Sequence, residues 1–407
     1  MDILIARQPI FDVNRRLFAY ELLFRGTEGH DIDKLEGDRA TTSLLSATFL
    51  TEGIDRISGF KPCFINFTND LLLQNLPASF PSSQIVIEIL EDVIPSPEVI
   101  SICRALSKKG YTLALDDFVY DRRLEPLIEI ADIIKIDIIG TPLDTIHKTL
   151  YRLSRHDKIK LLAEKVETYA EYEKALKLGF IYFQGYFFSQ PEVMSIKELT
   201  TAKINLLRLL AEASAETTSV SRLTEIISHD VAISYKLLRF LNSAWFSRIS
   251  KIESISHAIA YLGDQELRRF LMLMIISEMA TKKPQELVRL AIVRAQFCEL
   301  LAAASGKFGK QNNLFLLGLF SLIDAMLDAP MEDLMKDLPI DEQIKEALIK
   351  QNGPLMPYLD AVITYERKKA KECIQALVKI GVAGKDVYEL YLQSLEFAQA
   401  LTSSDTP

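Results

Sequence analysis

Residues 85–118 read IVIEILEDVIPSPEVISICRALSKKGYTLALDDF, and their pattern predicts a strand, a helix and a second strand. The first six and the last seven residues form short runs rich in β-branched and other apolar side chains, which is typical of strands. Between them, Ser96 and Pro97 supply the N-cap and first turn of a helix that Gly110 ends. One β/α unit is therefore expected here.

The same alternation continues on both sides of this unit. Further strands are expected at 17–24, 63–67, 133–138, 159–166 and 182–188. Helices are expected near 39–50, at 123–131 and at 142–155. A capping box formed by Thr168 and Glu171 opens one more helix, which Gly179 closes. The first half of the chain is thus predicted to be an α/β domain.

The second half has a different pattern. From about residue 195 the chain shows long helical periodicity with few strand candidates, and turn signals such as Gly353-Pro354 punctuate it. A chain of 407 residues is long enough for two or three domains. We expect an α/β domain at 1–192 followed by an all-helical domain at 196–401.

The composition excludes several classes of protein. The chain has 47 Lys and Arg against 55 Asp and Glu, a net charge of −8, so it lacks the basic surface that general binding to nucleic acids or anionic membranes needs. It shows neither a signal-peptide pattern nor an apolar stretch of the ~20 residues that a membrane span needs. The four widely spaced cysteines are expected to be reduced core thiols. We therefore expect a cytoplasmic protein.

Polar side chains interrupt nearly every expected strand. Strands that helices cover are normally continuous apolar runs, so a charge within one requires a partner or a function. The interrupting residues are Glu21, Asn66, Glu88, Asp116, Asp117, Lys135, Glu164 and Gln184. Most of them lie toward the strand ends, where a β/α barrel gathers its active site.

Five of these residues are carboxylates, which repel one another when they meet at one barrel mouth. Divalent cations relieve that repulsion, and oxygen ligands favour Mg²⁺ or Mn²⁺ over zinc. We expect Asp116 to be the central carboxylate that bridges two ions. Two such ions suit the hydrolysis of a phosphodiester, with Lys135 orienting the hydroxide or neutralising developing charge.

A structural role competes with this interpretation. Any one of these residues alone is explained by an ion pair or a strand-end cap, whereas the whole set indicates a functional site. Asp137 and Glu167 fit a structural role at least as well as a functional one. Glu91, three residues after Glu88, is expected to support the loop at the mouth.

These residues, in this order, resemble the EAL family of cyclic di-GMP phosphodiesterases over about residues 3–192. The motifs that carry the resemblance are Gln8-Pro9-Ile10, Glu21-Leu22-Leu23-Phe24-Arg25, Asn66-Phe67-Thr68, Glu88-Ile89-Leu90-Glu91, Asp116-Asp117-Phe118, Lys135-Ile136-Asp137, Ala163-Glu164-Lys165-Val166-Glu167-Thr168 and Gln184-Gly185-Tyr186. The resemblance implies a TIM-like barrel with its first strand reversed, two Mg²⁺ or Mn²⁺ ions, and hydrolysis of cyclic di-GMP to linear pGpG in a bacterial signalling pathway.

The resemblance also implies roles for individual residues. The implied metal ligands are Glu21, Asn66, Glu88, Asp116, Asp117 and Glu164. The implied catalytic residues are Lys135, Glu164 and Gln184, and the residues implied to contact the substrate are Gln8, Leu23 and Arg25. Glu91 and Glu167 are expected to support the site.

Two departures from the family pattern leave two hypotheses open. The signature Glu-Ala-Leu is Glu21-Leu22-Leu23 here, which keeps the ligand. The family's Gly-Thr-Gly segment, linked there to metal binding and dimer contact, is replaced by VYDR at 119–122. The complete ligand set favours an active phosphodiesterase. The altered loop favours an inactive barrel that senses cyclic di-GMP or serves as a scaffold.

The helical half resembles the HDOD domain, a relative of the HD-type phosphohydrolases that lacks their metal site. The resemblance rests on 226–231, 237–243 and 255–263. His229 and Asp230 form an HD pair, but residues 191–407 contain only two histidines, too few for an HD metal site, so Asp230 is expected to cap the following helix. The resemblance implies binding of an unidentified protein partner or regulation of the barrel, and a homodimer is a further possibility.

Overall fold

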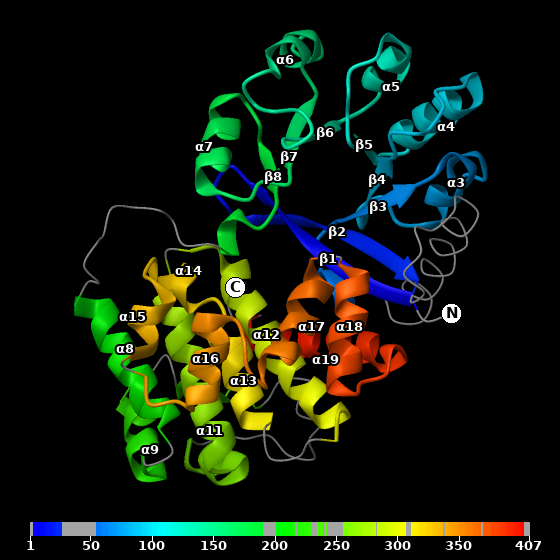
Figure 1. The fold of residues 1–407 in the computed structure, drawn as a ribbon. Helices are drawn as coiled ribbons and strands as arrows, with labels where there is room; N and C mark the ends of the chain where they lie inside the picture. Colours follow the sequence, from blue (N-terminus) through cyan, green and yellow to red (C-terminus); the bar gives the residue numbers. More distant parts are fainter. Residues whose placement is uncertain are drawn as a thin grey trace. The chain divides into compact units, whose positions relative to one another are not determined.

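The computed structural model describes residues 3–26, 54–189, 201–215, 218–229, 234–235, 237–238, 241, 255–281, 283–306, 311–336, 338–367 and 369–402. The chain divides into two compact units, Met1–Phe188 with Tyr365–Lys371, and Ser189–Thr364 with Glu372–Pro407. The domain limits 1–192 and 196–401 stay predictions, because residues 190–200 lie outside the described ranges. Figure 1 shows the elements of each unit.

The first unit is a closed barrel of eight strands that follow one another in sequence order. The strands are β1 (Ile3–Asp12), β2 (Leu17–Gly26), β3 (Cys63–Phe67), β4 (Ile85–Ile89), β5 (Thr112–Leu115), β6 (Ile133–Asp137), β7 (Lys160–Glu164) and β8 (Tyr182–Gln184). Strand β1 pairs antiparallel with both β2 and β8, whereas the other neighbours pair parallel. The predicted TIM-like barrel with a reversed first strand is confirmed.

Short helices connect the barrel strands and face outward (Figure 1). They are α2 (Ile54–Ser58), α3 (Asn69–Leu73), α4 (Pro97–Lys108), α5 (Glu125–Ile128), α6 (His147–Leu153) and α7 (Tyr169–Lys177), with 3-10 turns η2 (Leu76–Ser79), η3 (Arg122–Leu124) and η4 (Phe187–Ser189). Ser96 caps α4 by accepting the Val99 N–H at 3.3 Å, and Thr168 with Glu171 forms the capping box of α7. Both caps confirm the sequence prediction.

Some elements are shorter than predicted. The helix expected at 142–155 is only α6, and the strand expected at 112–118 stops at Leu115. The strand expected at 182–188 stops at Gln184, because Gly185 has a φ of 148° that ends the extended conformation. The resemblance implied a reversed first strand, but the residue pattern did not locate β1, because Pro9 interrupts its apolar pattern. The helix expected near 39–50 falls outside the described residues.

An apolar layer fills the barrel, with one residue from each strand. Its members are Ile10, Ala19, Phe64, Val86, Ala114, Ile133, Leu162 and Tyr182. Side chains alternate between the two faces of a strand. On β2 to β8, the residue two positions after each member of this layer therefore also points into the barrel. On the reversed β1, the residue two positions before Ile10 does so. The core thereby fixes a second inward layer, at the mouth formed by the carboxyl ends of the parallel strands.

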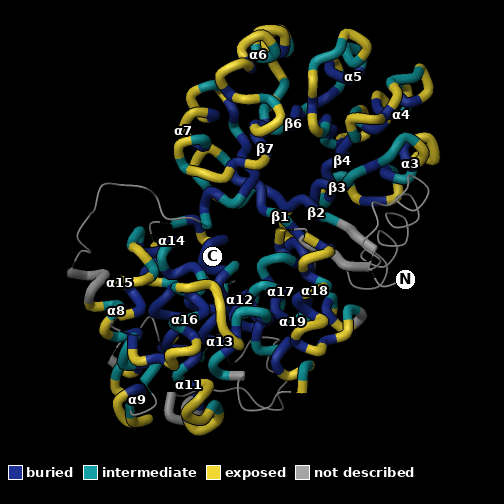
Figure 2. Tube along the Cα trace, in the orientation of Figure 1, coloured by how far each residue is buried: buried dark blue, intermediate teal, exposed yellow. Residues whose placement is uncertain are grey.

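The second unit is all-helical among its described residues, as predicted. Its helices are α8 (Thr201–Ser214), α9 (Val220–His229), α11 (Ile255–Met279), α12 (Gln285–Ala304), α13 (Gln311–Phe320), α14 (Ile323–Leu327), α15 (Met331–Lys336), α16 (Glu342–Lys350), α17 (Met356–Glu366), α18 (Ala370–Ile380) and α19 (Gly384–Thr402). Helix α12 packs against α13 and α19 and is buried along most of its length (Figure 2). A Cβ on Gly318 would overlap the Arg294 carbonyl, so this glycine permits the close contact of α12 and α13.

Three further expectations concern the whole chain. All four cysteines lie among the described residues as buried thiols outside any disulfide, as expected. Within the described ranges, no helix has the length and apolar character needed to cross a membrane. The expected cap residue Asp230 is not among the described residues, so that prediction is not tested.

Gly185 should be required for the barrel, because a Cβ there would overlap the backbone of Val166. We expect Gly185→Ala to destabilise the protein by about 3 kcal/mol, which lowers the melting temperature of the barrel by roughly 6 to 12 °C. Gly179→Ala is the matched control. Gly179 also has a positive φ, of 93°, but no atom of the described residues, apart from its chain neighbours, lies within 4 Å of its Cβ position. It should cost about 1 kcal/mol. Equal melting temperatures for the two variants in calorimetry would contradict this account.

Candidate active site

The second inward layer of the barrel is polar on every strand. Two positions from each member of the apolar layer lie Gln8, Glu21, Asn66, Glu88, Asp116, Lys135, Glu164 and Gln184. We call these eight residues the polar ring. Glu88 and Lys135 are fully buried, and Glu21, Glu164 and Gln184 are buried to more than nine tenths. The apolar layer below them therefore seals the ring from that side of the barrel.

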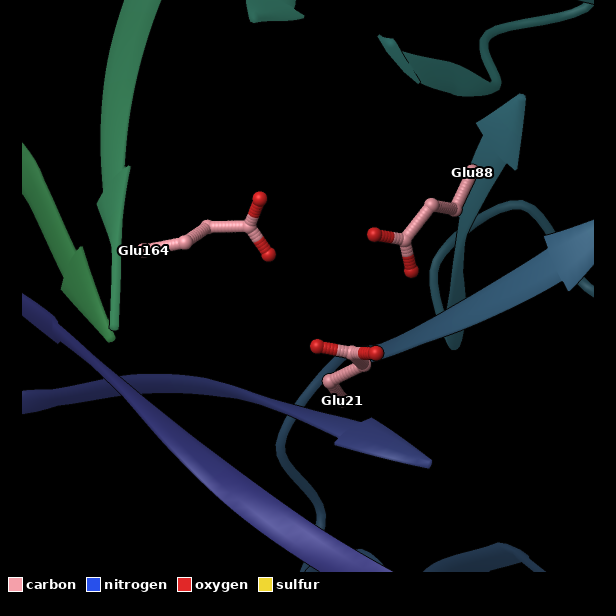
Figure 3. A group of neighbouring side chains, drawn as sticks. All are labelled: Glu21, Glu88 and Glu164. Carbon is pink, nitrogen blue, oxygen red and sulfur yellow. The ribbon is translucent and has the colours of Figure 1, made fainter. Parts of the chain in front are cut away.

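The ammonium group of Lys135 lies among four carboxylates of the ring. Its Nζ is 2.8 Å from Asp116 Oδ1, 2.8 Å from Glu164 Oε1 and 3.5 Å from Glu21 Oε2, and it also contacts Glu88 Oε1. Figure 3 shows the carboxylates of Glu21, Glu88 and Glu164 directed toward one another. One oxygen from each lies within 4.8 Å of the others.

These contacts change the ionisation of the ring. Burial raises the pKa of Glu88 well above its usual value, although the Lys135 ammonium opposes the shift. Burial likewise raises the pKa of Glu164 to about 7, again against Lys135. Burial alone would lower the pKa of Lys135, but the surrounding carboxylates outweigh it and hold the pKa well above its usual value. The lysine therefore stays charged, but the raised pKa values of Glu88 and Glu164 indicate that one ammonium does not offset the mutual repulsion of the carboxylates.

Several buried oxygen atoms of the ring have no hydrogen-bond partner among the described residues. They are Asn66 Oδ1, Glu88 Oε2, Glu164 Oε2 and Gln184 Oε1. Leaving a buried polar atom unpaired costs about 1 to 3 kcal/mol, so such a group calls for an explanation. Oxygen atoms beside an excess of carboxylate charge are suitable ligands for Mg²⁺ or Mn²⁺. The residues present thus fit the divalent cations that the sequence predicts.

A second acidic group lies at the mouth beside the ring. One oxygen each from Glu91, Asp116 and Asp117 lies within 4.8 Å of the others. Asp116 therefore belongs to this second group and also contacts Lys135 of the ring, and its bridging of two ions stays a prediction. The Asp116 N–H donates to the Ile89 carbonyl at 2.9 Å, and the Phe118 N–H donates to the Lys135 carbonyl at 2.9 Å. These bonds fix the Asp-Asp pair to β4 and β6.

A pocket of 470 Å³ opens next to this second group. The loops that follow β4 and β5 line it, including Glu91, Asp116, Asp117 and Tyr120. The Tyr120 hydroxyl donates to Glu125 Oε1 at 2.5 Å, and the Arg152 guanidinium lies 4.1 Å from the centre of its ring. Arg122 is exposed. The altered loop therefore lines the pocket and leaves it open.

The remaining predicted residues occupy different places. The Gln184 side-chain amide donates to Gln8 Oε1 at 3.1 Å and to Glu21 Oε2 at 2.5 Å, so Gln8 and Gln184 belong to the ring. Leu23 is half-buried on β2, two residues beyond Glu21. The side chain of Arg25 lies outside the described residues. Glu167 is exposed, and its backbone N–H donates to Glu171 Oε2 at 2.9 Å, in the capping region of α7.

Two residues lie closer to the acidic groups than their sequence positions indicated. Glu91 was expected only to support the loop, yet its carboxylate joins Asp116 and Asp117. Its spacing of three residues from Glu88 placed it near the mouth but did not show which way its side chain points. Lys165 was not singled out, and its ammonium lies 4.0 Å from Asp117 Oδ1. No sequence signal marks it, because its position depends on a left-handed backbone with a φ of 57°.

Comparisons with known proteins agree with this geometry. The EAL domain model matches residues 60–191 and the HDOD domain model matches residues 199–331. The Bacillus subtilis protein YuxH is 37% identical over 409 residues, covering 98% of this chain and 99% of that protein. The Vibrio cholerae cyclic di-GMP phosphodiesterase CdgJ is 37% identical over 398 residues, covering 97% of this chain and 92% of that protein.

Solved structures give a more distant likeness. The calcium and cyclic di-GMP complex of Klebsiella pneumoniae BlrP1 is 23% identical, with a TM-score of 0.39. The match covers 47% of this chain and 56% of that chain. At this level the likeness carries no argument about function.

Lys135→Met tests the charge balance of the ring. In metal-free protein the variant leaves three buried carboxylates and the partly buried Asp116 without their ammonium, so we expect a loss of about 3 to 5 kcal/mol of stability. Added Mg²⁺ should raise the melting temperature of the variant more than that of the wild-type protein, since no ammonium competes with the ion. Calorimetry in EDTA and then in Mg²⁺ measures both effects.

Lys158→Met is the control for this comparison. Lys158 forms only an exposed ion pair, 4.0 Å from Asp132 Oδ1, so its loss should cost less than about 1 kcal/mol. If Lys135→Met were as stable as Lys158→Met in EDTA, the four carboxylates would not depend on the ammonium.

Proposed function

The chain belongs to the family of proteins in which an EAL domain precedes an HDOD domain, and from this premise we propose that it hydrolyses cyclic di-GMP to linear pGpG with divalent cations. The observation that carries the proposal is the polar ring, where carboxylates outnumber the ammonium. In the part of the chain that the structure describes, Asn66 Oδ1, Glu88 Oε2 and Glu164 Oε2 have no hydrogen-bond partner. The activity named for the Vibrio cholerae relative supports the same reaction.

Two cations, Mg²⁺ or Mn²⁺, are proposed to occupy the two acidic groups. The first would be held by ring oxygens of Glu21, Asn66, Glu88 and Glu164. The second would be held by Asp116 and Asp117, with Glu91 as an added ligand. When bound, such a pair of ions activates a water and stabilises the departing oxygen of a phosphodiester.

The protein's own residues have separate tasks in this proposal. Lys135, fixed by its ion pairs, keeps a positive charge beside the attacking water and the developing negative charge. The Gln184 amide holds the Glu21 carboxylate in position by donating to Oε2. Gln8, Leu23 and Arg25 are proposed to contact the substrate, and a guanidinium such as that of Arg25 suits a phosphate.

The arrangement favours an active enzyme over a sensor or scaffold. A scaffold would be supported if Tyr120 or Arg122 filled the mouth. Instead Glu125 and Arg152 engage Tyr120, Arg122 is exposed, and the pocket beside Asp117 stays open. The loss of the glycine-rich segment therefore does not block this side of the site.

The rest of the assignment completes the proposal. We propose that the protein acts in the cytoplasm and that its HDOD domain binds a protein partner or regulates the barrel. A homodimer is part of the same proposal. The absence of a basic excess in the sequence, with a net charge of −8, supports a small anionic substrate bound locally over general nucleic-acid binding.

Glu21→Gln tests the proposal directly. With Mg²⁺ or Mn²⁺, the wild-type protein should convert cyclic di-GMP to pGpG, and EDTA should abolish the conversion. Glu21→Gln should lower turnover at least about a hundredfold, because a neutral amide replaces a charged ligand at the reaction centre. Chromatographic separation of the two nucleotides provides the measurement.

Glu173→Gln is the matched control, since Glu173 is an exposed residue of α7. It undergoes the same chemical change and should leave turnover unchanged. Metal-dependent binding of cyclic di-GMP without pGpG would replace the enzyme with the sensor. Equal turnover in Glu21→Gln and wild type would contradict the metal assignment.

A further inference from the structure

Lys165 introduces a positive charge at the mouth of the barrel. It follows Glu164 at the end of β7, and its backbone is left-handed, with a φ of 57°. That conformation costs a residue with a side chain roughly 1 to 2 kcal/mol. Its Nζ lies 2.6 Å from Asp137 Oδ2 and 4.0 Å from Asp117 Oδ1. The left-handed backbone of Lys165 thus goes together with an ammonium that lies beside Asp137 and Asp117.

Asp137 anchors this ammonium. Its Oδ1 accepts the Ile139 N–H at 2.8 Å, which leaves Oδ2 for Lys165. A Cβ on Gly140 would come within 3.2 Å of Oδ2, so the glycine leaves room for the pair. The Lys165–Asp137 contact is therefore held from two sides, and the lysine is not a free surface chain.

Asp117 is the residue that this charge affects. Its backbone is also left-handed, with a φ of 38°, and its carboxylate belongs to the second acidic group with Glu91 and Asp116. A cation bound to that group faces the Lys165 ammonium across Asp117. Two like charges a few ångströms apart repel, and a divalent ion is repelled twice as strongly as a monovalent one.

We propose that Lys165 is an internal counter-ion of Asp117 that competes with the second divalent cation and so sets the affinity of that site. The inference rests on the function proposed above. Lys135 contacts Glu21, Glu88 and Glu164 of the first group, and it also reaches the second group through Asp116. Lys165 is therefore a further ammonium beside the second group, on the side of Asp117. Lys135 is fully buried, whereas about half of the Lys165 side chain is exposed. A change in the charge at the partly exposed Lys165 should therefore alter the occupancy of the second cation.

The alternative is that Lys165 positions Asp117 for the cation. The two roles predict opposite results when the charge is removed. If Lys165 competes with the cation, removing its charge makes the cation bind more tightly. If Lys165 positions Asp117, removing it makes the cation bind more weakly. Repulsion of about 1 kcal/mol between partly exposed charges corresponds to a fivefold effect, so we expect a change of roughly threefold to tenfold.

The experiment is calorimetric titration of Mn²⁺ into the full chain without cyclic di-GMP. We expect two binding events in the wild-type protein. In Lys165→Met the weaker event should tighten roughly threefold to tenfold, with the stronger event unchanged. Lys165→Arg keeps the charge and should match the wild type. Lys165→Asn serves as a second uncharged variant, since Asn tolerates a left-handed backbone.

Lys174→Met is the matched control. Lys174 also forms an ion pair of 2.6 Å, with Asp144, and its side chain is similarly exposed. Removing its charge should leave both events unchanged. An unchanged or weakened second event in Lys165→Met would overturn the inference alone. One Mn²⁺ per chain in every protein would overturn the inference and also contradict the proposed second cation. A chain that binds no Mn²⁺ would also contradict the proposed function.

Discussion

The contact of one ammonium with four carboxylates is the constraint on which the site depends. Lys135 projects from β6 into a layer that also receives Glu21, Glu88, Asp116 and Glu164 from four other strands. The charges are sealed from below by the apolar layer, so they cannot be solvated from that side. One lysine leaves an excess of negative charge, and several buried oxygen atoms beside it have no hydrogen-bond partner among the residues described. Divalent cations would supply the missing positive charge and would bind these oxygen atoms. The arrangement therefore fits a cation-dependent phosphodiesterase.

The mouth of the barrel adds a second, more accessible site to this buried one. Asp116 belongs to the second acidic group and also contacts Lys135 of the polar ring, while Asp117 has a left-handed backbone. The loop that follows departs from the family pattern, yet Tyr120 fixes it through Glu125 and Arg152. Contacts of Tyr120 therefore stabilise the loop after Asp116 and Asp117, in place of the family's glycine-rich segment. Lys165 then gives this chain its own control over the second cation.

Much of the barrel and of the ring could be predicted from the sequence, because charges on otherwise apolar strands violate the rule for buried parallel sheets. Glu88 within IVIEIL is the clearest example. The position of strand β1 escaped prediction because Pro9 hides its alternation. Lys165 escaped because backbone handedness does not show in the sequence of a residue other than glycine. Glu91 was underrated because a strand-end loop can direct a side chain inward or outward, and spacing alone does not decide which.

The most direct test of the two-cation site is an anomalous difference map from crystals of the full chain grown with Mn²⁺ and cyclic di-GMP. The account predicts two manganese peaks, one among oxygens of Glu21, Asn66, Glu88 and Glu164 and one at Asp116 and Asp117. Nucleotide density should lie at the mouth beside them. A map without a peak in the polar ring, with Lys135 still bound by all four carboxylates, would contradict the account.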